Sequence, residues 1–364
     1  MNKTTGLPSE SAEIYGLQAQ GLPLAPLARA AQELLREGAS ANTRRSYAAA
    51  YRYWQAWHRA RWQQELALPL SVDVVAQFIV DHVARTQAHG FKSELPSAVE
   101  ERMRSEGVKA APGIPALSTV VHRVAVLSRL HEAQRLPNPC RDPAIRALLS
   151  AARRAQAKRG LHARKKDALT REHLEALLAT CDQSLAGKRD RALLLFAWAS
   201  GGRRRSEVAE AELAALRRLG PKSYVYELRV SKTNAAGSER AENFKPIQGR
   251  AARALADWLD ASGLKEGRIF RRIDRAGRLG PSLSSTAVAN LVKKRCASAG
   301  LSGDFGAHSL RSGFVTEAAR QSVPLAETMA MTGHRSVASV LGYFRAATLE
   351  SRAARLLESE PEFE

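Results

Sequence analysis

Acidic residues, cysteines and long apolar runs are all scarce in this sequence. Across 364 residues, 36 Asp and Glu stand against 56 Lys and Arg, which gives a formal net charge of +20 and a pI near 10.5. The longest apolar run, 192–199, is too short to cross a bilayer. Glu10 and Glu13 lie where a signal peptide would be apolar. We therefore expect no membrane association and a cytoplasmic location.

The chain also lacks the usual signatures of metal and nucleotide sites. Its three cysteines, Cys140, Cys181 and Cys296, are far apart and do not have metal-ligand spacing. There is no carboxylate cluster of the kind that two-metal nucleases use, and no GKT-type loop to hold a nucleotide phosphate. The expectation is three reduced thiols, no bound metal and no cofactor.

Positive charge is what the sequence has in excess. A charge of +20 exceeds what solubility needs, so a polyanion is the expected partner, and double-stranded DNA is a better candidate than a membrane surface. Basic side chains gather on one side of the first predicted helix and towards the middle of the chain. They could form solvated faces or bind phosphates, and the overall charge favours phosphates. The expected DNA contacts are Arg44, Arg45, Arg52, Arg153, Arg154, Lys158, Arg159, Arg164, Lys165 and Lys166.

The first half of the chain has the pattern of a helical domain. Residues 1–38 are weakly patterned, and we expect partial disorder there. The next stretch, SANTRRSYAAAYRYWQAWHRARW, predicts a helix that Asn42 or Thr43 caps. Four ring-bearing side chains on it recur at helical spacing and predict a core face: Tyr47, Tyr51, Trp54 and His58.

Three more amphipathic helices are expected at 71–86, 117–136 and 142–159, with a long connection over 89–115. We assign the helical domain to 39–155. A basic linker follows at 156–167, where Gly160 interrupts the charged run.

The second half predicts a mostly helical domain with a small antiparallel sheet. Thr170 can cap one helix, and GKRDRALLLFAWASGG predicts a strongly apolar helix that ends on two glycines. SYVYELRV and AENFKPI alternate as strands do, with turn residues between them. This domain is expected over 168–347, and Leu and Ala at helical spacing predict a tail helix at 348–364. The fold class is thus mainly α, of the α+β kind.

Three short motifs in the second half carry polar side chains in a fixed order. They are GGRRRSE, HSLRSGF and TGHRSVASVLGYFR, and the last contains the only tyrosine that follows the arginine and histidine motifs. Taken singly, each has an ordinary explanation: a solvated arginine, a helix-capping histidine or a packed tyrosine. The ordered set is much more specific than any one of its members.

This ordered set resembles the tyrosine recombinase family, the integrases related to the phage lambda and Cre enzymes, over roughly residues 42–350. NTRRSYAAAYRYW is similar to the core-binding helical (SAM-like) domain of that family, and 127–154 is similar to the end of that domain in the Cre-like branch. The resemblance implies a two-domain clamp around DNA. It also implies a homotetramer on paired sites, with a tail that docks on a neighbouring subunit. An accessory DNA-bending or directionality factor is compatible with it.

The resemblance also implies which residues are catalytic. Arg204 matches the first arginine, although Arg203 stands where an apolar residue is commoner. Lys232 matches a hairpin lysine, and Tyr343 matches the nucleophile. The full implied set is Arg204, Glu207, Lys232, His308, Arg311, His334 and Tyr343.

Chemistry explains why such residues belong together. A phosphodiester is anionic and its alkoxide leaves badly, so two arginines and imidazoles would neutralise charge in the transition state. The expected activity is site-specific DNA recombination through a 3′-phosphotyrosyl intermediate, in integration, excision or resolution of a mobile element or replicon. A type IB topoisomerase and a DNA-binding regulator without catalysis are the alternatives.

Overall fold

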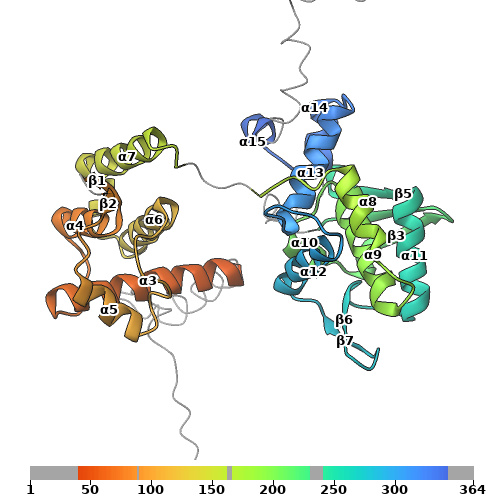
Figure 1. Ribbon diagram of the computed structural model, residues 1–364, viewed down its shortest axis with the longest axis horizontal. Coiled ribbons are helices and arrows are strands. Elements are labelled where there is room, and N and C mark those ends of the chain that lie inside the picture. The colour runs from red at the N-terminus through yellow and green to blue at the C-terminus, as the bar shows by residue number, and fades with distance from the viewer. Residues whose placement is uncertain (1–39, 88–89, 162–165, 230–240, 343–364) are drawn as a thin grey trace, which may run out of the picture. The chain divides into compact units, whose positions relative to one another are not determined.

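The computed structural model describes residues 40–87, 90–161, 166–229 and 241–342, and the chain divides into two compact units, Met1–Ala163 and Arg164–Glu364 (Figure 1). The described residues of both units are mainly helical, with small antiparallel sheets. The expected fold class is therefore confirmed. No helix in these ranges is both long and apolar enough to span a bilayer.

The first unit is built from α-helices that surround an aromatic core. Its described α-helices are α3 (Ala41–Trp62), α4 (Val72–His82), α5 (Ser97–Ser105), α6 (Leu117–Ala133) and α7 (Pro143–Lys158). A short 3₁₀ turn, η1 (Pro139–Arg141), precedes α7, and α7 continues through residues 156–158 of the expected linker.

Aromatic side chains of α3 form the centre of this unit. Trp54 and Trp57 are fully buried, and the Trp54 ring stacks on Phe78 of α4 with centroids 3.7 Å apart. The predicted core face is confirmed, since Tyr51, Trp54 and His58 are all buried. The predicted cap is wrong, because α3 begins at Ala41, before both Asn42 and Thr43.

Ser40, in extended backbone, is the N-cap of α3, and its side chain accepts a hydrogen bond from the Thr43 backbone N–H at 3.1 Å. The helix predicted over 71–86 is also shorter than expected. It ends at His82, because Val83 is extended, and Arg85–Gln87 (β1) pairs with Gly90–Lys92 (β2). This hairpin was not predicted, because each strand has only three residues and all of them are exposed.

The second unit combines helices with a three-stranded sheet. Its described α-helices are α8 (Arg171–Ala179), α9 (Leu185–Ala199), α10 (Arg205–Ala209), α11 (Gly249–Ser262), α12 (Ser285–Ser298), α13 (Ala307–Arg320), α14 (Leu325–Thr332) and α15 (Val337–Leu341). Two short 3₁₀ turns, η2 (Leu213–Ala215) and η3 (Ala241–Asn243), precede strands. Thr170 is the N-cap of α8, as its sequence predicts.

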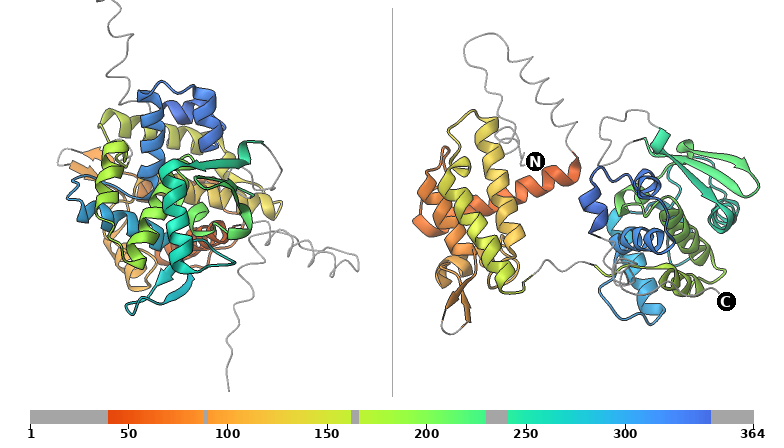
Figure 2. Two further views of the ribbon diagram at one scale, coloured as in Figure 1. Left: turned by 90° about the vertical axis from the view of Figure 1, so that its right-hand side faces the viewer. Right: turned by 90° about the horizontal axis from the view of Figure 1, so that it is seen from above.

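The sheet has the antiparallel order β3–β4–β5 and lies beside the helical cluster (Figure 2). Strands β4 (Ser223–Glu227) and β5 (Phe244–Gln248) were predicted, and their pairing places Tyr226 opposite Lys245. Strand β3 (Leu216–Gly220) was missed because its central residues are exposed and do not alternate. A separate hairpin, β6 (Arg271–Ile273) and β7 (Leu279–Ser282), follows α11.

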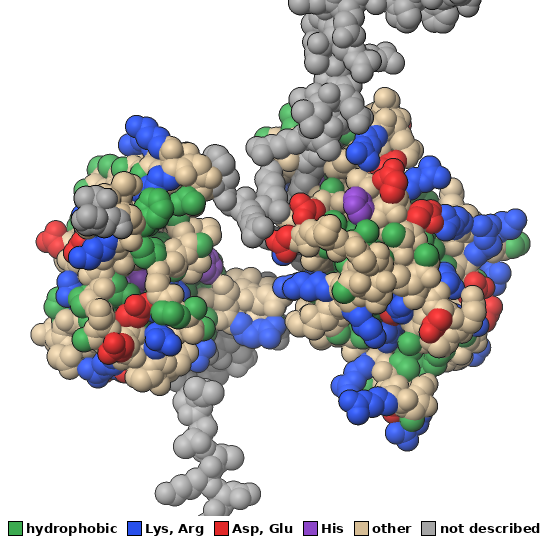
Figure 3. All heavy atoms as spheres, viewed as in Figure 1, with side chains coloured by type: hydrophobic (Ala, Val, Ile, Leu, Met, Phe, Trp, Pro, Cys, Tyr) green, Lys and Arg blue, Asp and Glu red, His purple; other side chains and the backbone are tan. Residues whose placement is uncertain are grey.

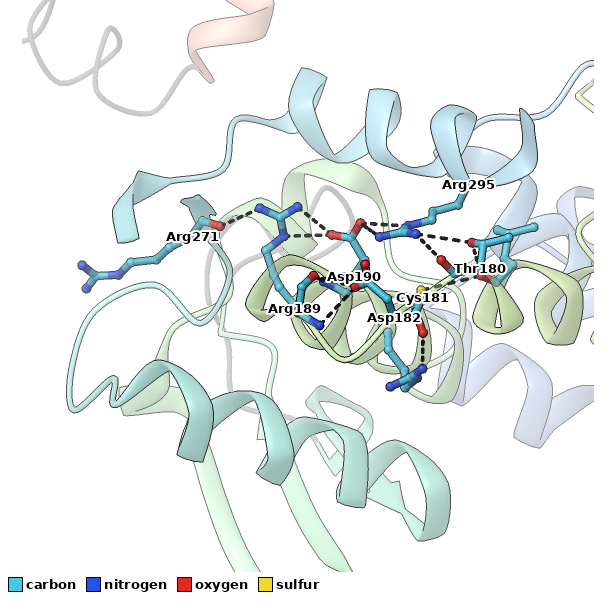
Figure 4. Close-up of polar contacts among 11 residues, drawn as sticks. Thr180, Cys181, Asp182, Arg189, Asp190, Arg271 and Arg295 are labelled. Atoms are coloured by element: carbon cyan, nitrogen blue, oxygen red, sulfur yellow. Dashed lines mark hydrogen bonds and ion pairs between the residues drawn. The ribbon is translucent and has the colours of Figure 1, made fainter. Parts of the chain in front are cut away.

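Helix α9 is the central element of the second unit and is apolar on most of its surface. At its polar start, the carboxylate of Asp190 bridges two guanidinium groups, those of Arg189 and Arg295 (Figure 4). Arg295 lies on α12 and also donates to the Thr180 carbonyl at 2.6 Å. Asp190 is 4 % exposed. The paired charges therefore fix α12 against α9, and α12 forms one wall of the site described next.

Candidate active site

The second unit contains a cleft of about 540 Å³ between α10, α12 and the start of α13. Basic and polar side chains line it, among them Arg204, His308 and Arg311. Three of the predicted site residues therefore open onto one space, although α11, α12 and about a hundred residues of sequence separate the two motifs that supply them.

A glycine turn sets the position of the first arginines. Gly201 and Gly202 follow α9 with φ of +93° and +66°, a conformation that other residues rarely adopt. A Cβ at Gly202 would lie 2.4 Å from the Cα of Arg311, so only glycine allows this approach. The turn therefore presses the GGRRRSE motif against α13.

Glu207 orients Arg204 at the start of α10. One carboxylate oxygen accepts from the Arg204 guanidinium at 2.5 Å, and the other accepts from the Arg204 backbone N–H at 3.1 Å. Glu207 is 7 % exposed, whereas the Arg204 side chain is partly exposed. The buried Glu207 carboxylate thus fixes the backbone and the guanidinium of Arg204, while the Arg204 side chain stays accessible from the cleft.

The three consecutive arginines of this motif have different surroundings. Arg203 is 1 % exposed, Arg204 is partly exposed and Arg205 is exposed. The guanidinium of Arg203 donates to the Met331 carbonyl, on the side of α14. Of the three, Arg204 combines a fixed orientation with access to the cleft.

Helix α13 supplies His308 and Arg311 from its first turns. Arg311 is 1 % exposed, and its Nη1 donates to the Gly202 carbonyl at 3.4 Å. Gly313 allows the helix to pack closely, because a Cβ there would lie 1.7 Å from the Leu169 carbonyl oxygen. The backbone N–H of Leu169 also donates to the Ser309 carbonyl at 2.9 Å. The helix is thereby held rigidly at the floor of the cleft.

His334 joins this group from the turn after α14. Its Nδ1 lies 2.8 Å from Thr332 Oγ1, and Arg311 Nε donates to its Nε2 at 3.3 Å. The Thr332 hydroxyl already donates to the Thr328 carbonyl, so it accepts from His334. This hydrogen-bond network assigns the neutral tautomer with its proton on Nδ1.

Burial and the neighbouring cations keep both histidines neutral. Desolvation, followed by the charges of Arg311 and Arg204, lowers the pKa of His334 to about 4. The same causes lower the pKa of His308 below its ordinary value. A neutral imidazole at neutral pH can accept a proton, which is the form that a general base needs.

Two of the predicted site residues, Lys232 and Tyr343, lie outside the described residues. Strands β4 and β5 flank the segment that contains Lys232. Helix α15, with Ser336 as its N-cap, ends two residues before Tyr343. The hairpin turn expected between the two strands and the predicted tail helix at 348–364 also lie outside these ranges.

The predicted DNA contacts occupy different environments. Arg44, Arg45 and Arg52 are exposed on α3, and Arg153, Arg154 and Lys158 are exposed on α7. Figure 3 shows Lys and Arg side chains on both units, including a group at the β6–β7 hairpin.

The remaining predicted contacts differ from these. Arg159 is half-buried, donates to the Ala84 carbonyl at 3.0 Å and lies over the Phe91 ring. Lys166 lines the cleft and pairs with Asp304. Arg164 and Lys165 lie outside the described residues.

The sequence reasoning missed one wall of the cleft. Thr286, Asn290 and Lys293 of α12 line it, at spacings of four and three along one helical face. The opposite face of α12 is buried through Val288 and Val292. This amphipathic pattern is visible in the sequence, but nothing in the sequence alone says that the polar face meets the arginine motifs.

The structure also bears on the cysteines and on metals. All three thiols are free and buried, and burial raises the pKa of Cys140 to about 12 and that of Cys296 to about 11. Among the residues described, no group of three His, Cys, Asp or Glu side chains could hold a metal ion.

Comparison with known proteins decides the family. Residues 167–350 match the model of the phage integrase family. The chain belongs to this family of tyrosine recombinases. It is also 35 % identical over 235 residues to an integrase/recombinase xerD homolog of Selenomonas ruminantium, a match that covers 62 % of this chain and 67 % of that protein. The resemblance seen in the motifs is thus confirmed, and the chain is a tyrosine-type site-specific DNA recombinase.

Solved structures share the fold at low sequence identity. The XerH site-specific recombinase bound to a palindromic difH substrate has a TM-score of 0.55 at 17 % identity, and the match covers 86 % of this chain and 80 % of that one. The Tn1549 transposon integrase in complex with transposon right end DNA has a TM-score of 0.55 at 15 % identity, with 95 % and 98 % covered. A lambda integrase dimer bound to a COC′ core site scores 0.52 at 16 % identity, with 87 % and 93 % covered.

Proposed function

We propose that the recombinase cuts and rejoins DNA through Tyr343 and that the described cleft binds the scissile phosphate. The phenol oxygen of Tyr343 attacks phosphorus, the bond to the 5′ oxygen breaks, and a 3′-phosphotyrosyl link forms. A 5′ hydroxyl from another strand reverses the step without an external energy source. The convergence of Arg204, His308 and Arg311 on one cleft, with His334 hydrogen-bonded to Arg311, supports this proposal.

Each side chain has a role that its chemistry allows. Arg204 and Arg311 neutralise the charge that builds on the phosphate oxygens in the transition state. His308 accepts the proton of the Tyr343 phenol, whose ordinary pKa is near 10. Lys232 donates a proton to the departing 5′ oxygen.

Glu207 and His334 act through the two arginines and do not themselves contact the phosphate. Glu207 accepts from the Arg204 guanidinium and orients it. His334 accepts from Arg311 Nε and so restricts the rotation of that guanidinium. Both lie within the network that carries the two arginines. We count them with the site because the loss of either would remove a hydrogen bond that orients a cleft arginine.

The test is covalent trapping on a suicide substrate, a duplex from the DNA flanking the gene with a nick near the cleavage point. Wild-type protein should form an adduct that denaturing gel electrophoresis resolves. Tyr343→Phe should form none and still bind the duplex, because phosphate contacts supply most of the affinity. An adduct in the Tyr343→Phe protein at the wild-type rate would exclude Tyr343 as nucleophile.

The domain assignment, the assembly and the location are part of the same proposal. A helical domain at 39–155 and a catalytic domain at 168–347, joined by a basic linker, would enclose the duplex. Strand exchange between two duplexes needs four active sites, so we propose a homotetramer on paired sites, with the tail at 348–364 docked on a neighbour. An accessory DNA-bending or directionality factor would set the direction of the reaction, and the cytoplasm is where its DNA lies.

The two alternatives are not favoured. A regulator without catalysis would have no use for a cleft that assembles two oriented arginines with two histidines. A topoisomerase of type IB would relax supercoils as a monomer. Relaxation of plasmids that contain no recombination site, at a rate equal to recombination, would favour the topoisomerase.

A further inference from the structure

Two buried cations near the cleft, Arg203 in its lining and Lys245 on strand β5, have no part in the chemistry described above. Arg203 is 1 % exposed and Lys245 is 2 % exposed. Arg203 follows the glycine turn, whereas Lys245 comes from strand β5, on the same face of the strand as the buried Ile247. Burying a cation is costly unless it is paired or hydrogen-bonded, so their partners indicate what they do.

Both cations bind the same helix end. Arg203 Nη2 donates to the Met331 carbonyl at 2.5 Å, and Lys245 Nζ donates to the Ala330 carbonyl at 2.6 Å. These carbonyls belong to the last turn of α14, where no following helical N–H is available. Positive charge at a helix C-terminus is also favourable to the helix dipole.

This turn leads directly into His334. The backbone N–H of Gly333, in left-handed conformation with φ of 71°, donates to the Met329 carbonyl at 2.7 Å and ends the helix. Next to it, Thr332 is 1 % exposed and accepts from His334 Nδ1. A movement of the last turn of α14 would therefore shift His334 away from Arg311 Nε.

Arg203 also lies close to Glu207, the carboxylate that orients Arg204. Its Nη1 lies 3.7 Å from Glu207 Oε2, and the other oxygen of this carboxylate holds Arg204. The glycine turn presses on the same carbonyl, because a Cβ at Gly201 would lie 2.2 Å from the Met331 oxygen. One buried guanidinium thus links the turn before His334 to the carboxylate that orients Arg204.

We propose that Arg203 and Lys245 are positioning residues, which hold the last turn of α14 and thereby place the His334 imidazole against Arg311. The inference rests on the proposed function, since His334 and Arg311 belong to the proposed phosphate site. It adds two residues to that site which touch neither the phosphate nor the nucleophile. It also gives the start of β5, the strand that follows the segment containing Lys232, a direct contact with the helix before His334.

Thermal stability alone would not test this proposal. Replacing a buried ion by an apolar side chain of similar volume is often neutral or stabilising. Burial, followed by the charge of Arg203, lowers the pKa of Lys245 to about 8, which shows that the charged form is already disfavoured there. The decisive measurement must report the position of His334.

The titration of His334 is such a measurement. Full-length protein labelled at histidine is titrated without DNA by NMR, and the His334 signal is assigned with His334→Gln. In wild type the pKa should be near 4. In Lys245→Met, His334 should leave Arg311 and its buried site, and the pKa should rise by about one unit or more. An unchanged His334 pKa in folded Lys245→Met protein would overturn the proposal.

Lys245→Met is the cleaner variant, because Arg203 itself acts on His334. The charges that lower the His334 pKa directly are those of Arg311, Arg204, His308 and Arg203. Arg203→Met should raise the pKa as well, and Arg203→Lys should give an intermediate value. Should either Met variant fail to fold, Lys245→Arg and Arg203→Lys replace it. A wild-type His334 pKa in both of these variants would overturn the proposal.

Activity provides the second arm. Both Met variants should slow adduct formation by about tenfold or more, because misplacement by about 1 Å is costly. Affinity for the duplex should change by about twofold at most, since neither side chain is exposed to phosphates. The matched controls are Lys222→Met and Arg253→Met, which alter exposed cations.

The two arms separate the two proposals. Absence of any adduct with wild-type protein would refute the proposed function, while the NMR titration would still report whether the two cations hold His334. A raised His334 pKa with wild-type adduct formation would show that the cations hold His334 but that its position does not limit cleavage, which would overturn the positioning role.

Discussion

The first unit buries an acid and surrounds it with donors. Asp81 is fully buried beneath α3, where Trp57 Nε1 donates at 2.9 Å and Gln77 Nε2 donates at 2.7 Å. Arg61 lies 3.4 Å away and completes an ion pair. The charge is thus compensated inside the unit, and burial raises the pKa of Asp81 nevertheless.

The second unit instead buries an excess of positive charge. Three cations, Arg203, Arg311 and Lys245, are buried near the cleft, and the buried carboxylate of Glu207 pairs with Arg203 among them. The comparison teaches that a buried ion pair neutralises charge in the core of the first unit, whereas near the cleft of the second unit buried cations outnumber buried carboxylates and are held mainly by backbone carbonyls. The predictions below test this difference, from the largest expected effect to the smallest.

The largest effect concerns salt. If the exposed cations of the first unit and the two cleft arginines of the second, Arg204 and Arg311, both meet phosphates, affinity for a duplex should fall by about 10³ to 10⁵ between ~50 and ~200 mM salt. The double change Arg44→Gln and Arg45→Gln should lower the slope of log affinity against log salt by roughly two. Fluorescence anisotropy at four salt concentrations measures both. If the double change left the slope of log affinity against log salt unaltered, Arg44 and Arg45 of α3 would not contact phosphates.

A core substitution tests the independence of the first unit. Trp54→Ala removes a fully buried ring that stacks on Phe78, and should lower the free energy of unfolding of this unit by about 3 to 5 kcal/mol. Urea unfolding followed by circular dichroism should then show an earlier first transition. The half-buried Tyr47→Ala is the control, with a smaller loss. Equal losses would contradict the burial difference.

Acid should destabilise the first unit through His82. Burial lowers the pKa of this histidine to about 4 from 6.5, so the unfolded chain binds more protons between those pH values. Stability should therefore fall as pH falls through this window, by about 3 kcal/mol at its lower end. Urea unfolding at several pH values measures the slope. His82→Gln should flatten it, and an unchanged slope would contradict the assignment.

Loss of either cleft arginine should slow cleavage. Arg311→Ala and Arg204→Ala should each lower the rate of adduct formation by at least ~10², as removal of an oxyanion donor does. The measurement is single-turnover cleavage of the suicide substrate. Arg272→Ala, on the exposed β6–β7 hairpin, is the control for lost positive charge. Comparable rates in all three variants would argue against phosphate stabilisation in the cleft.

The smallest effect is at the start of α3. Ser40→Ala removes the side chain that accepts from the Thr43 N–H, and should cost about 1 kcal/mol of unfolding free energy. Asn42→Ala is the matched change one residue into the helix, and should cost less. A larger loss of unfolding free energy for Asn42→Ala than for Ser40→Ala would indicate that Asn42 is the N-cap, as the sequence predicted.

Periodicity and motif order were enough to predict much of this chain. The ring-bearing face of α3, the apolar character of α9 and the alternation in β4 and β5 follow from the local sequence, because each element buries one side along its own length. The ordered arginine, histidine and tyrosine motifs indicated the family. None of these inferences needed contacts between distant segments.

The tertiary structure decided what distant segments do to one another. The alternation in β5 predicted a strand, but only the tertiary structure shows that Lys245 is buried on it and that its ammonium binds the Ala330 carbonyl. Likewise, GGRRRSE contains three adjacent arginines, and only the approach of Gly202 to Arg311 separates Arg203, which faces α14, from Arg204, which faces the cleft. The physical reason is that burial and hydrogen-bond partners depend on contacts between residues that lie 85 to 128 positions apart, whereas the sequence pattern records only neighbours within a turn or a strand.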